Sequence, residues 1–354
     1  MEAYIRDLVI PATSEEAASS ARARWDAIAK PLGSLGALED AVVKIAALTG
    51  SAQVDVRPRC AVVLCADNGV VAQGVAQSDP HVSALIAQSV ARGKSSVCRM
   101  GAAADVDCVA VDMGLFEAAD EPGMLDRRIA AGTRDFTQGP AMTRAQAIQA
   151  IRTGVELVGD LARKGYGLIA TGEMGIGNTT TSTAIACAFT ERDPEALAGR
   201  GAGLSDKGLV RKIDAIRRAL AVNEPDPSDP LDVLAKLGGF DIAGMCGMFL
   251  GGAVYRVPIV IDGLISTVAA YCATRLRPEC LDAMLPSHLS AEPAAAELLA
   301  RMGLRPIIHA SMRLGEGTGA VCLVPLLDMA LSLYHDGPTY ADFGIVAGEG
   351  KTQA

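Results

Sequence analysis

The chain has 354 residues, of which half are hydrophobic and only 4% are aromatic, and its formal net charge is −9. This length predicts one large domain with a smaller appendage. The acidic charge disfavours a general nucleic-acid surface, because phosphate backbones are bound by an excess of Lys and Arg, but it remains compatible with a small ligand in a local pocket. Abundant Gly with few aromatic residues favours helices on a parallel sheet over a β-sandwich.

The cysteines and the apolar runs of the sequence indicate the cellular compartment of the protein. Nine cysteines form an odd set without a C-x-x-C pair, which indicates reduced thiols. The N-terminus has no apolar signal core, and the longest uncharged apolar run, Ile242 to Tyr255, is shorter than the ~20 residues of a membrane span. We therefore expect a cytoplasmic protein without a membrane segment.

Two helices are predicted near the N-terminus with no strand between them. The pattern Thr-Ser-Glu-Glu at 13–16 is typical of a capping box and predicts a helix to about Lys30, where Pro31 and Gly33 end it. The second helix has one apolar face, formed by Leu38, Val42, Ile45 and Leu48.

Four apolar runs predict buried strands: Cys60–Ala66, Val106–Val111, Tyr166–Ala170 and Pro258–Ile261. Three of them lead quickly into helical patterns, so we predict an α/β fold with a parallel Rossmann-like sheet flanked by helices. Such sheets bind ligands at the carboxyl ends of their strands. The polar motifs expected there are Asp-Asn-Gly at 67–69, Asp-Met-Gly at 112–114, the loop from Gly172, and Asp262-Gly263.

Further elements are predicted between and after these strands. Thr143 to Gln146 forms a capping pattern before a helix whose apolar face includes Ile148 and Val155. Residues 224–230, rich in Pro and Asp, predict a surface loop. Residues 322–334 predict an apolar core helix, and the tail after Gly344 has little to hold it.

Residues 172–181, Gly-Glu-Met-Gly-Ile-Gly-Asn-Thr-Thr-Thr, follow directly on the third predicted strand. Their glycines allow backbone N–H groups to approach an anion, and a helix starting near Thr179 directs its positive end to the same place. The composition therefore predicts a phosphate-binding loop. A tight strand-to-helix turn without a ligand is the alternative.

Several common nucleotide and metal motifs are missing. Gly93-Lys94-Ser95 has Gln88 where a Walker A loop needs glycine, and the 172–177 segment lacks the dinucleotide spacing. Residues 259–267 have one acidic residue, Asp262, where ordinary phosphoribosyltransferases have two adjacent ones. The four histidines lack ligand spacing. We expect neither a metal nor a cofactor.

Three more segments suit an anion or a flat ligand. Gly199–Gly203 precedes the basic residues Lys207, Arg211 and Lys212, although a loop before a basic helix face is the simpler interpretation in isolation. At 288–293 a hydroxyl and a carboxylate precede a helix, where an N-cap and a phosphate contact are equally supported. Glu316 lies among glycines at the start of an apolar helix, where it either complements the helix dipole or borders space for a ligand.

Together these motifs closely resemble the nicotinate-nucleotide:dimethylbenzimidazole phosphoribosyltransferases, glycosyltransferases that make the lower-ligand nucleotide of cobalamin. The matching segments follow the family order over nearly the whole chain: 30–36, 66–70, 139–143, 172–181, 262–263, 290–293 and 313–319. The resemblance implies a large α/β domain at 51–325, a small helical domain built from both termini (1–50 and 326–354), and a homodimer.

The resemblance also implies the reaction and the site. Phosphoribosyl would pass from nicotinate mononucleotide to 5,6-dimethylbenzimidazole or a related base, giving an α-ribazole 5′-phosphate type nucleotide and nicotinate. Glu316 matches the general base and Glu173 a second carboxylate near the reacting centre, while Gly175, Lys212 and Ser290 match positions that hold the phosphate. The predicted substrate-binding set is Gly175, Gly177, Asn178, Thr179, Gly201, Gly203, Lys212, Asp262, Gly263, Ser290, Leu314 and Gly315.

Two segments depart from the family pattern. The loop at 76–84 lacks the Ser, Tyr and Glu that well-known members show in the base pocket, and Ala202 replaces a usual Thr. The first departure leaves the identity of the attacking base open. It also motivates an alternative hypothesis, a non-catalytic nucleotide- or base-binding subunit of a heteromeric complex.

Overall fold

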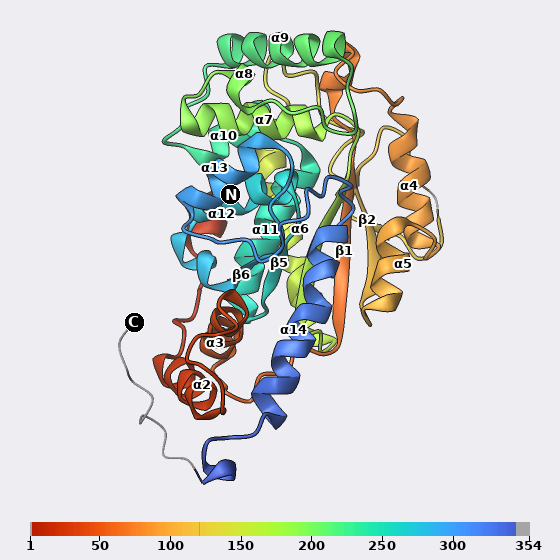
Figure 1. Ribbon diagram of the computed structural model, residues 1–354. Coiled ribbons are helices and arrows are strands. Elements are labelled where there is room, and N and C mark those ends of the chain that lie inside the picture. The colour runs from red at the N-terminus through yellow and green to blue at the C-terminus, as the bar shows by residue number, and fades with distance from the viewer. Residues whose placement is uncertain (1, 120, 345–354) are drawn as a thin grey trace.

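A six-stranded parallel sheet forms the centre of the molecule (Figure 1), in a computed structural model that describes residues 2–119 and 121–344. The strand order is β3-β2-β1-β4-β5-β6. The strands are β1 Arg59–Ala66, β2 Asp107–Gly114, β3 Leu125–Asp126, β4 Leu168–Met174, β5 Ile259–Ile261 and β6 Met284–Pro286. This is the doubly wound order, whose topological switch point lies between β1 and β4. The predicted Rossmann-like sheet is confirmed.

Helices cover both faces of the sheet, as β1 illustrates. All its residues are buried, and successive side chains alternate: Val62 and Leu64 belong to one core, Val63 and Cys65 to the other. The first core is completed by α6 (Arg144–Arg163), α11 (Phe240–Tyr255) and α12 (Leu264–Leu276). The second is completed by α4 (His81–Ala91), α5 (Ser96–Ala103) and α14 (Thr318–Asp336).

The tightest helix contact joins α6 and α11, and it depends on glycine. A Cβ atom added to Gly154 would clash with the carbonyl of Gly244, and one added to Gly247 would clash with the carbonyl of Ile151. The two backbones therefore touch, which fixes α11 and its first-turn residues relative to the sheet.

The N-terminal helices are α1 (Glu2–Arg6), α2 (Glu15–Ala27) and α3 (Ala37–Thr49). The predicted pair is confirmed with corrected ends: Ser14 rather than Thr13 caps α2, accepting from the N–H of Ala17 at 3.1 Å, and extended backbone at Ile28 ends it before Lys30. Helix α3 packs on α14. Helices α2 and α3 both lie at one end of the sheet (Figure 1). The expected boundary at 325/326 falls inside α14, and the two-domain division stays a prediction.

Helix α14 confirms the predicted core helix and extends it to 318–336. Among the described residues it alone is long and apolar enough to cross a membrane, by length and composition. It packs instead on β4, α3 and α5, and its Asp328 pairs with the buried guanidinium of Arg59 at 2.5 Å. These contacts are those of a core helix.

The other helices are α7 (Asn178–Thr190), α8 (Pro194–Leu197), α9 (Asp206–Asn223), α10 (Pro230–Leu237) and α13 (Pro293–Arg301), with short 3₁₀ turns at Gly69–Gln73, Pro278–Ala283 and Ala341–Phe343. The Thr143 capping box is confirmed, and the predicted loop at 224–230 is confirmed except for its last residue, Pro230, which begins α10. The tail after Gly344 lies outside the described residues.

Two expectations at the sheet edge were wrong. Strand β2 continues through Gly114 and β4 through Met174, so 112–114 and 172–174 are strand residues rather than loops. In addition, β3 and β6 were not predicted, because neither of these short segments was identified as a separate apolar run.

Candidate active site

A cavity of about 180 Å³ opens at the carboxyl ends of β4, β5 and β6. It collects most of the predicted site residues although they are distant in sequence. The predicted residues that line it are Glu173, Gly175, Gly177, Asn178, Thr179, Gly201, Asp262, Gly263, Ser290, Leu314 and Gly315. Three predicted residues, Gly203, Lys212 and Glu316, do not line it.

Glu173 is the penultimate residue of β4 and is buried, with 8% of its surface exposed. Burial is the main reason why the pKa of its carboxyl rises to about 8, and the nearby carboxylates of Asp241 and Asp262 raise it further. A hydrogen bond from the amide of Asn178 has the opposite effect. Glycine at 315 leaves the space, because a Cβ there would lie 2.7 Å from a Glu173 oxygen.

The turn from β4 into α7 supplies backbone donors. At Gly175 a Cβ would clash with the carbonyl of Ala66, and Gly177 caps α7 with a left-handed φ of 93°. Both residues line the cavity, as do Asn178 and Thr179 of the first turn. The N-terminus of α7 therefore faces the cavity, the arrangement that binds anions.

Lys212 lies behind Thr179 rather than on the cavity wall. Its buried ammonium donates to the Thr179 hydroxyl at 3.1 Å and to the Gly199 carbonyl at 3.0 Å. Burial lowers its pKa to about 8, while the charge of Glu292 opposes the shift. Glu292 in turn accepts from the N–H of Gly201 at 2.9 Å, so this cation and carboxylate support the 199–204 loop from behind.

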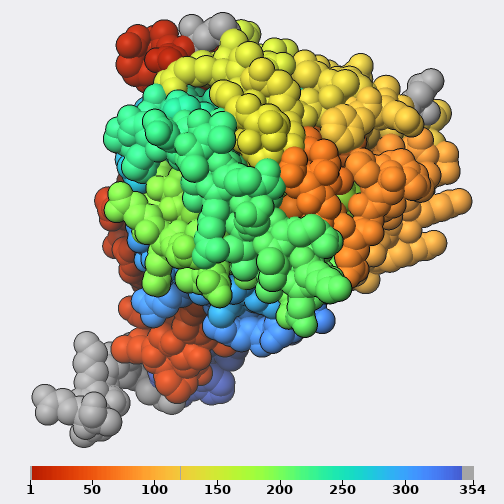
Figure 2. All heavy atoms as spheres, turned by 90° about the horizontal axis from the view of Figure 1, so that it is seen from above, coloured from red at the N-terminus to blue at the C-terminus, as the bar shows by residue number. Residues whose placement is uncertain are grey.

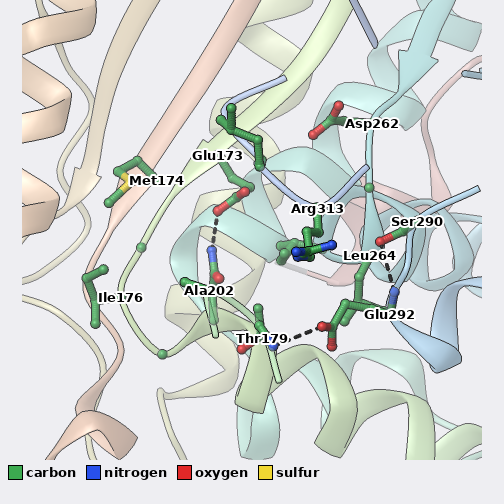
Figure 3. A pocket seen from close by; sticks show the side chains of 18 of the residues that line it. Glu173, Met174, Ile176, Thr179, Ala202, Asp262, Leu264, Ser290, Glu292 and Arg313 are labelled. Carbon is green, nitrogen blue, oxygen red and sulfur yellow. Dashed lines mark hydrogen bonds between the residues drawn. The ribbon is translucent and has the colours of Figure 1, made fainter. Parts of the chain in front are cut away.

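The wall opposite α7 comes from β5 and β6. Asp262, directly after β5, accepts from the N–H of Ala320 at 2.9 Å, and burial raises its pKa. Ser290 lines the cavity and accepts from the N–H of Glu292 at 3.3 Å; helix α13 has no side-chain cap. Figure 3 shows Glu173 and Asp262 in the upper part of the view, with Ser290 and Glu292 below and to the right.

The carboxylate of Glu316 is held at the start of α5 and does not line the cavity. It accepts from the N–H of Val97 at 3.3 Å, at the start of α5, and the N–H of Ser96 and the Ser95 hydroxyl also lower its pKa. Burial has the larger effect and raises that pKa. The backbone of Glu316, with a left-handed φ of 61°, packs on Gly172 and donates its N–H toward Glu173.

Two loops meet at the rim of the cavity. The Gln77 amide donates to the carbonyl of Gly203, and Arg211 on α9 donates to the carbonyl of Gly74 at 2.9 Å. In Figure 2 the green surface of α9 accordingly touches the orange surface around residues 74–78. Residues 75–78 line the cavity, so the loop that departs from the family pattern borders the site.

Some lining and supporting residues were missed by sequence reasoning. Arg313 stands within the cavity in Figure 3, and only its position next to Leu314 in a glycine-rich motif pointed to it. Met174 and Ile176 add apolar wall. Asp241, on α11, accepts a hydrogen bond from the amide of Asn178, and no sequence motif marked it.

A metal centre was not expected. The described residues contain no group of three or more His, Cys, Asp or Glu side chains placed to hold a metal ion. All nine cysteines are free thiols.

Comparisons with known proteins agree over nearly the full length. A family profile described as phosphoribosyltransferase matches residues 10–345. The nicotinate-nucleotide–dimethylbenzimidazole phosphoribosyltransferase of Ruminiclostridium cellulolyticum is 45% identical over 327 residues, covering 92% of this chain and 93% of its own. That of Escherichia coli O17:K52:H18 is 39% identical over 338 residues, covering 95% and 94%.

Solved structures give the same result. The crystal structure of CobT from Thermus thermophilus superposes with a TM-score of 0.88 at 37% identity and covers 94% of this chain and 100% of that one. A second structure of the enzyme from that organism gives 0.87 and 36%, with coverage of 94% and 99%. The chain belongs to the nicotinate-nucleotide–dimethylbenzimidazole phosphoribosyltransferase family.

Proposed function

We propose that this protein transfers the phosphoribosyl group of nicotinate mononucleotide to 5,6-dimethylbenzimidazole or a related lower-ligand base in cobalamin biosynthesis. The products are an α-ribazole 5′-phosphate type nucleotide and nicotinate. The observation that carries the proposal is one cavity that combines a buried carboxylate, Glu173, with an anion-binding helix N-terminus.

The phosphate group binds at the start of α7. Its partners are the backbone donors around Gly175 and Gly177 and the hydroxyls of Thr179 and Ser290. The ammonium of Lys212 supplies the positive charge, because it donates a hydrogen bond to the Thr179 hydroxyl that contacts the phosphate. Such a clamp fixes C1′ of the ribose relative to the incoming base.

The bond changes need little acid catalysis. The bond from C1′ to the pyridinium nitrogen breaks and its electron pair neutralises that ring, so nicotinate leaves without a proton. The base forms a new bond to C1′ from the opposite face, which inverts the anomeric carbon. Above its raised pKa of about 8, an ionised Glu173 stabilises the positive charge that develops on the ribose.

Only the base must lose a proton, and we propose that Glu316, which directly follows the cavity-lining residue Gly315, is the acceptor. Its half-buried carboxyl has a raised pKa, which brings it closer to the operating pH and makes it a better proton acceptor. Val75, Ala76, Met174 and Ile176 give the cavity an apolar wall for a flat ring. We propose that the altered loop selects which base is accepted.

We also propose that the protein acts as a homodimer in the cytoplasm. Free thiols are typical of a reducing compartment. Exposed apolar side chains at Leu85 on α4 and Phe116 after β2 suit a subunit contact. Light scattering of the purified protein measures its mass in solution.

The test of the reaction is a panel of benzimidazoles, purines and phenols incubated with nicotinate mononucleotide in the presence of a chelator. Nicotinate release together with a new nucleotide, seen by chromatography and mass spectrometry, supports the proposal. Binding of nucleotide without product from any base would instead indicate a non-catalytic subunit.

A further inference from the structure

We infer that Asp241 is a positioning residue that fixes the side-chain amide of Asn178 and, through it, the carboxylate of Glu173. The inference rests on the function proposed above, because it assigns a partner to a residue proposed to act on the ribose. Asp241 does not line the cavity and would touch no substrate.

Three separate elements meet at the Asn178 amide. Its Nδ2 donates to an oxygen of Glu173 on β4 and to Oδ2 of Asp241 on α11, the latter at 2.9 Å. All three side chains are buried: 8% of Glu173 is exposed, 4% of Asn178 and none of Asp241. The two amide hydrogens are thus both used, one by each carboxylate.

Asp241 decides which end of the amide faces Glu173. An ionised carboxylate can only accept, so only the NH₂ end of Asn178 can face Asp241. A reversed amide would direct its oxygen at carboxylate oxygens and leave buried donors unpaired, which costs about 1–3 kcal/mol per group. The same orientation presents a donor to Glu173 and holds its carboxylate in one rotamer.

The surroundings keep Asp241 ionised and in place. Although burial raises its pKa to about 6, the Asn178 amide and the backbone N–H groups at the start of α11 oppose that shift. The carboxylate lies in the first turn of α11, where the helix dipole favours negative charge. A Cβ on Gly239 would clash with Oδ1 of Asp241, and one on Gly175 would lie 3.1 Å from Oδ2, so glycines leave the space it occupies.

The competing explanation is that Asp241 only stabilises the start of α11. If Asp241 only stabilises the helix, its removal should lower activity by the same factor whichever residue is present at position 173. A positioning residue matters only while Glu173 has a carboxylate to position. A double-mutant cycle separates the two.

The cycle measures kcat and KM for Asp241→Ala and Asp241→Asn, each in the wild-type background and in the Glu173→Gln background. We expect Asp241→Ala to lower kcat about tenfold or more, as loss of a preorganised group does, with KM for nicotinate mononucleotide changed less than about twofold. Asp241→Asn keeps an acceptor oxygen for Asn178 and should recover part of the loss. In the Glu173→Gln background, Asp241→Ala should cause no further loss.

The matched control is Asp112→Asn, which neutralises another buried carboxylate at the same sheet edge, bonded to the N–H groups of Gly114 and Leu115. It should leave kcat near the wild-type value. If Asp241→Ala lowers kcat equally in the wild-type and Glu173→Gln backgrounds, the inference is overturned.

Two further measurements test the inference independently of the activity of Asp241→Ala. If Asp241→Ala fails to fold, as seen by its melting temperature, Asn178→Ala in the same two backgrounds tests the link at its centre. Independently of turnover, the infrared carboxyl band that disappears in Glu173→Gln should shift in Asp241→Asn without substrate. An unshifted band contradicts the inference, whereas an inactive wild-type protein with a shifted band contradicts only the proposed function.

Discussion

The carboxylate of Glu316 accepts a hydrogen bond from the backbone N–H of Val97 at 3.3 Å, at the first turn of α5. The carboxylate of the proposed general base is therefore held by a helix N-terminus. The backbone N–H of Glu316 approaches Glu173, so one residue connects the two carboxylates proposed for the reaction. The helix end favours the ionised carboxylate and burial favours the neutral one, and burial has the larger effect.

Glu316→Gln tests the proton acceptor. Glutamine keeps an oxygen for the Val97 N–H but cannot take a proton, so kcat should fall about 10²–10⁴-fold, the range for positioned proton transfer. Calorimetry should show nicotinate mononucleotide binding within about twofold of wild type. A variant that retains the full rate would exclude Glu316 as the base.

Lys212→Met tests the buried cation behind Thr179. Charged hydrogen bonds contribute about 1.5–3 kcal/mol, so we expect KM for nicotinate mononucleotide to rise roughly 10- to 100-fold with a smaller change in kcat. The wild-type KM should increase with salt more steeply than that of the variant. Lys207→Met, on the exposed first turn of the same helix, is the control and should behave as wild type.

Glu173→Gln tests the raised pKa of Glu173 through stability. The folded-state value of about 8 lies above the usual 4.5, so between these values the folded state holds a proton that the unfolded state has released. This carboxyl therefore makes wild-type stability fall as pH rises through that window, and the variant lacks this contribution. Urea unfolding from pH 5.5 to 8.5 should show the free energy of unfolding of the variant increasing relative to wild type, with the difference levelling off above pH 8. A constant difference would show an ordinary pKa.

Local features of the site could be predicted from sequence, and features set by packing could not. The segment from Gly172 to Thr179 combines its glycines, its helix start and its donors in a few residues, so its composition alone indicated an anion site. Lys212 lies behind Thr179 only because α9 packs over α7. Asp241 meets Asn178 only because glycines bring α11 against α6 and the sheet. No local sequence pattern predicts these two contacts between distant segments.

The same distinction holds for the fold. Long buried strands such as β1 were predicted from consecutive apolar or small residues, and only their ends shifted. Strands β3 and β6 exist because a neighbouring strand offers free backbone groups, a property of the partner rather than of their own residues.

Arg313→Gln tests which nucleotide the cavity prefers. Arg313 lines the cavity and makes no hydrogen bond or ion pair with any other described side chain, whereas the carboxylates of Asp262 and Glu292 lie on the same walls. The carboxylate of nicotinate would be repelled by these two groups without a cation, so Arg313 is its expected partner. For nicotinate mononucleotide we expect kcat/KM to fall about tenfold or more in the variant.

Nicotinamide mononucleotide provides the matched comparison for this variant, because it differs from the substrate by an uncharged amide in place of the carboxylate. Its kcat/KM should change less than about twofold in Arg313→Gln, so the preference for the acid should shrink by roughly the loss measured with nicotinate mononucleotide. Arg313→Lys keeps the charge but not the bidentate geometry and should be intermediate. Equal losses for both nucleotides would mean that Arg313 supports the loop at Leu314 rather than the substrate carboxylate.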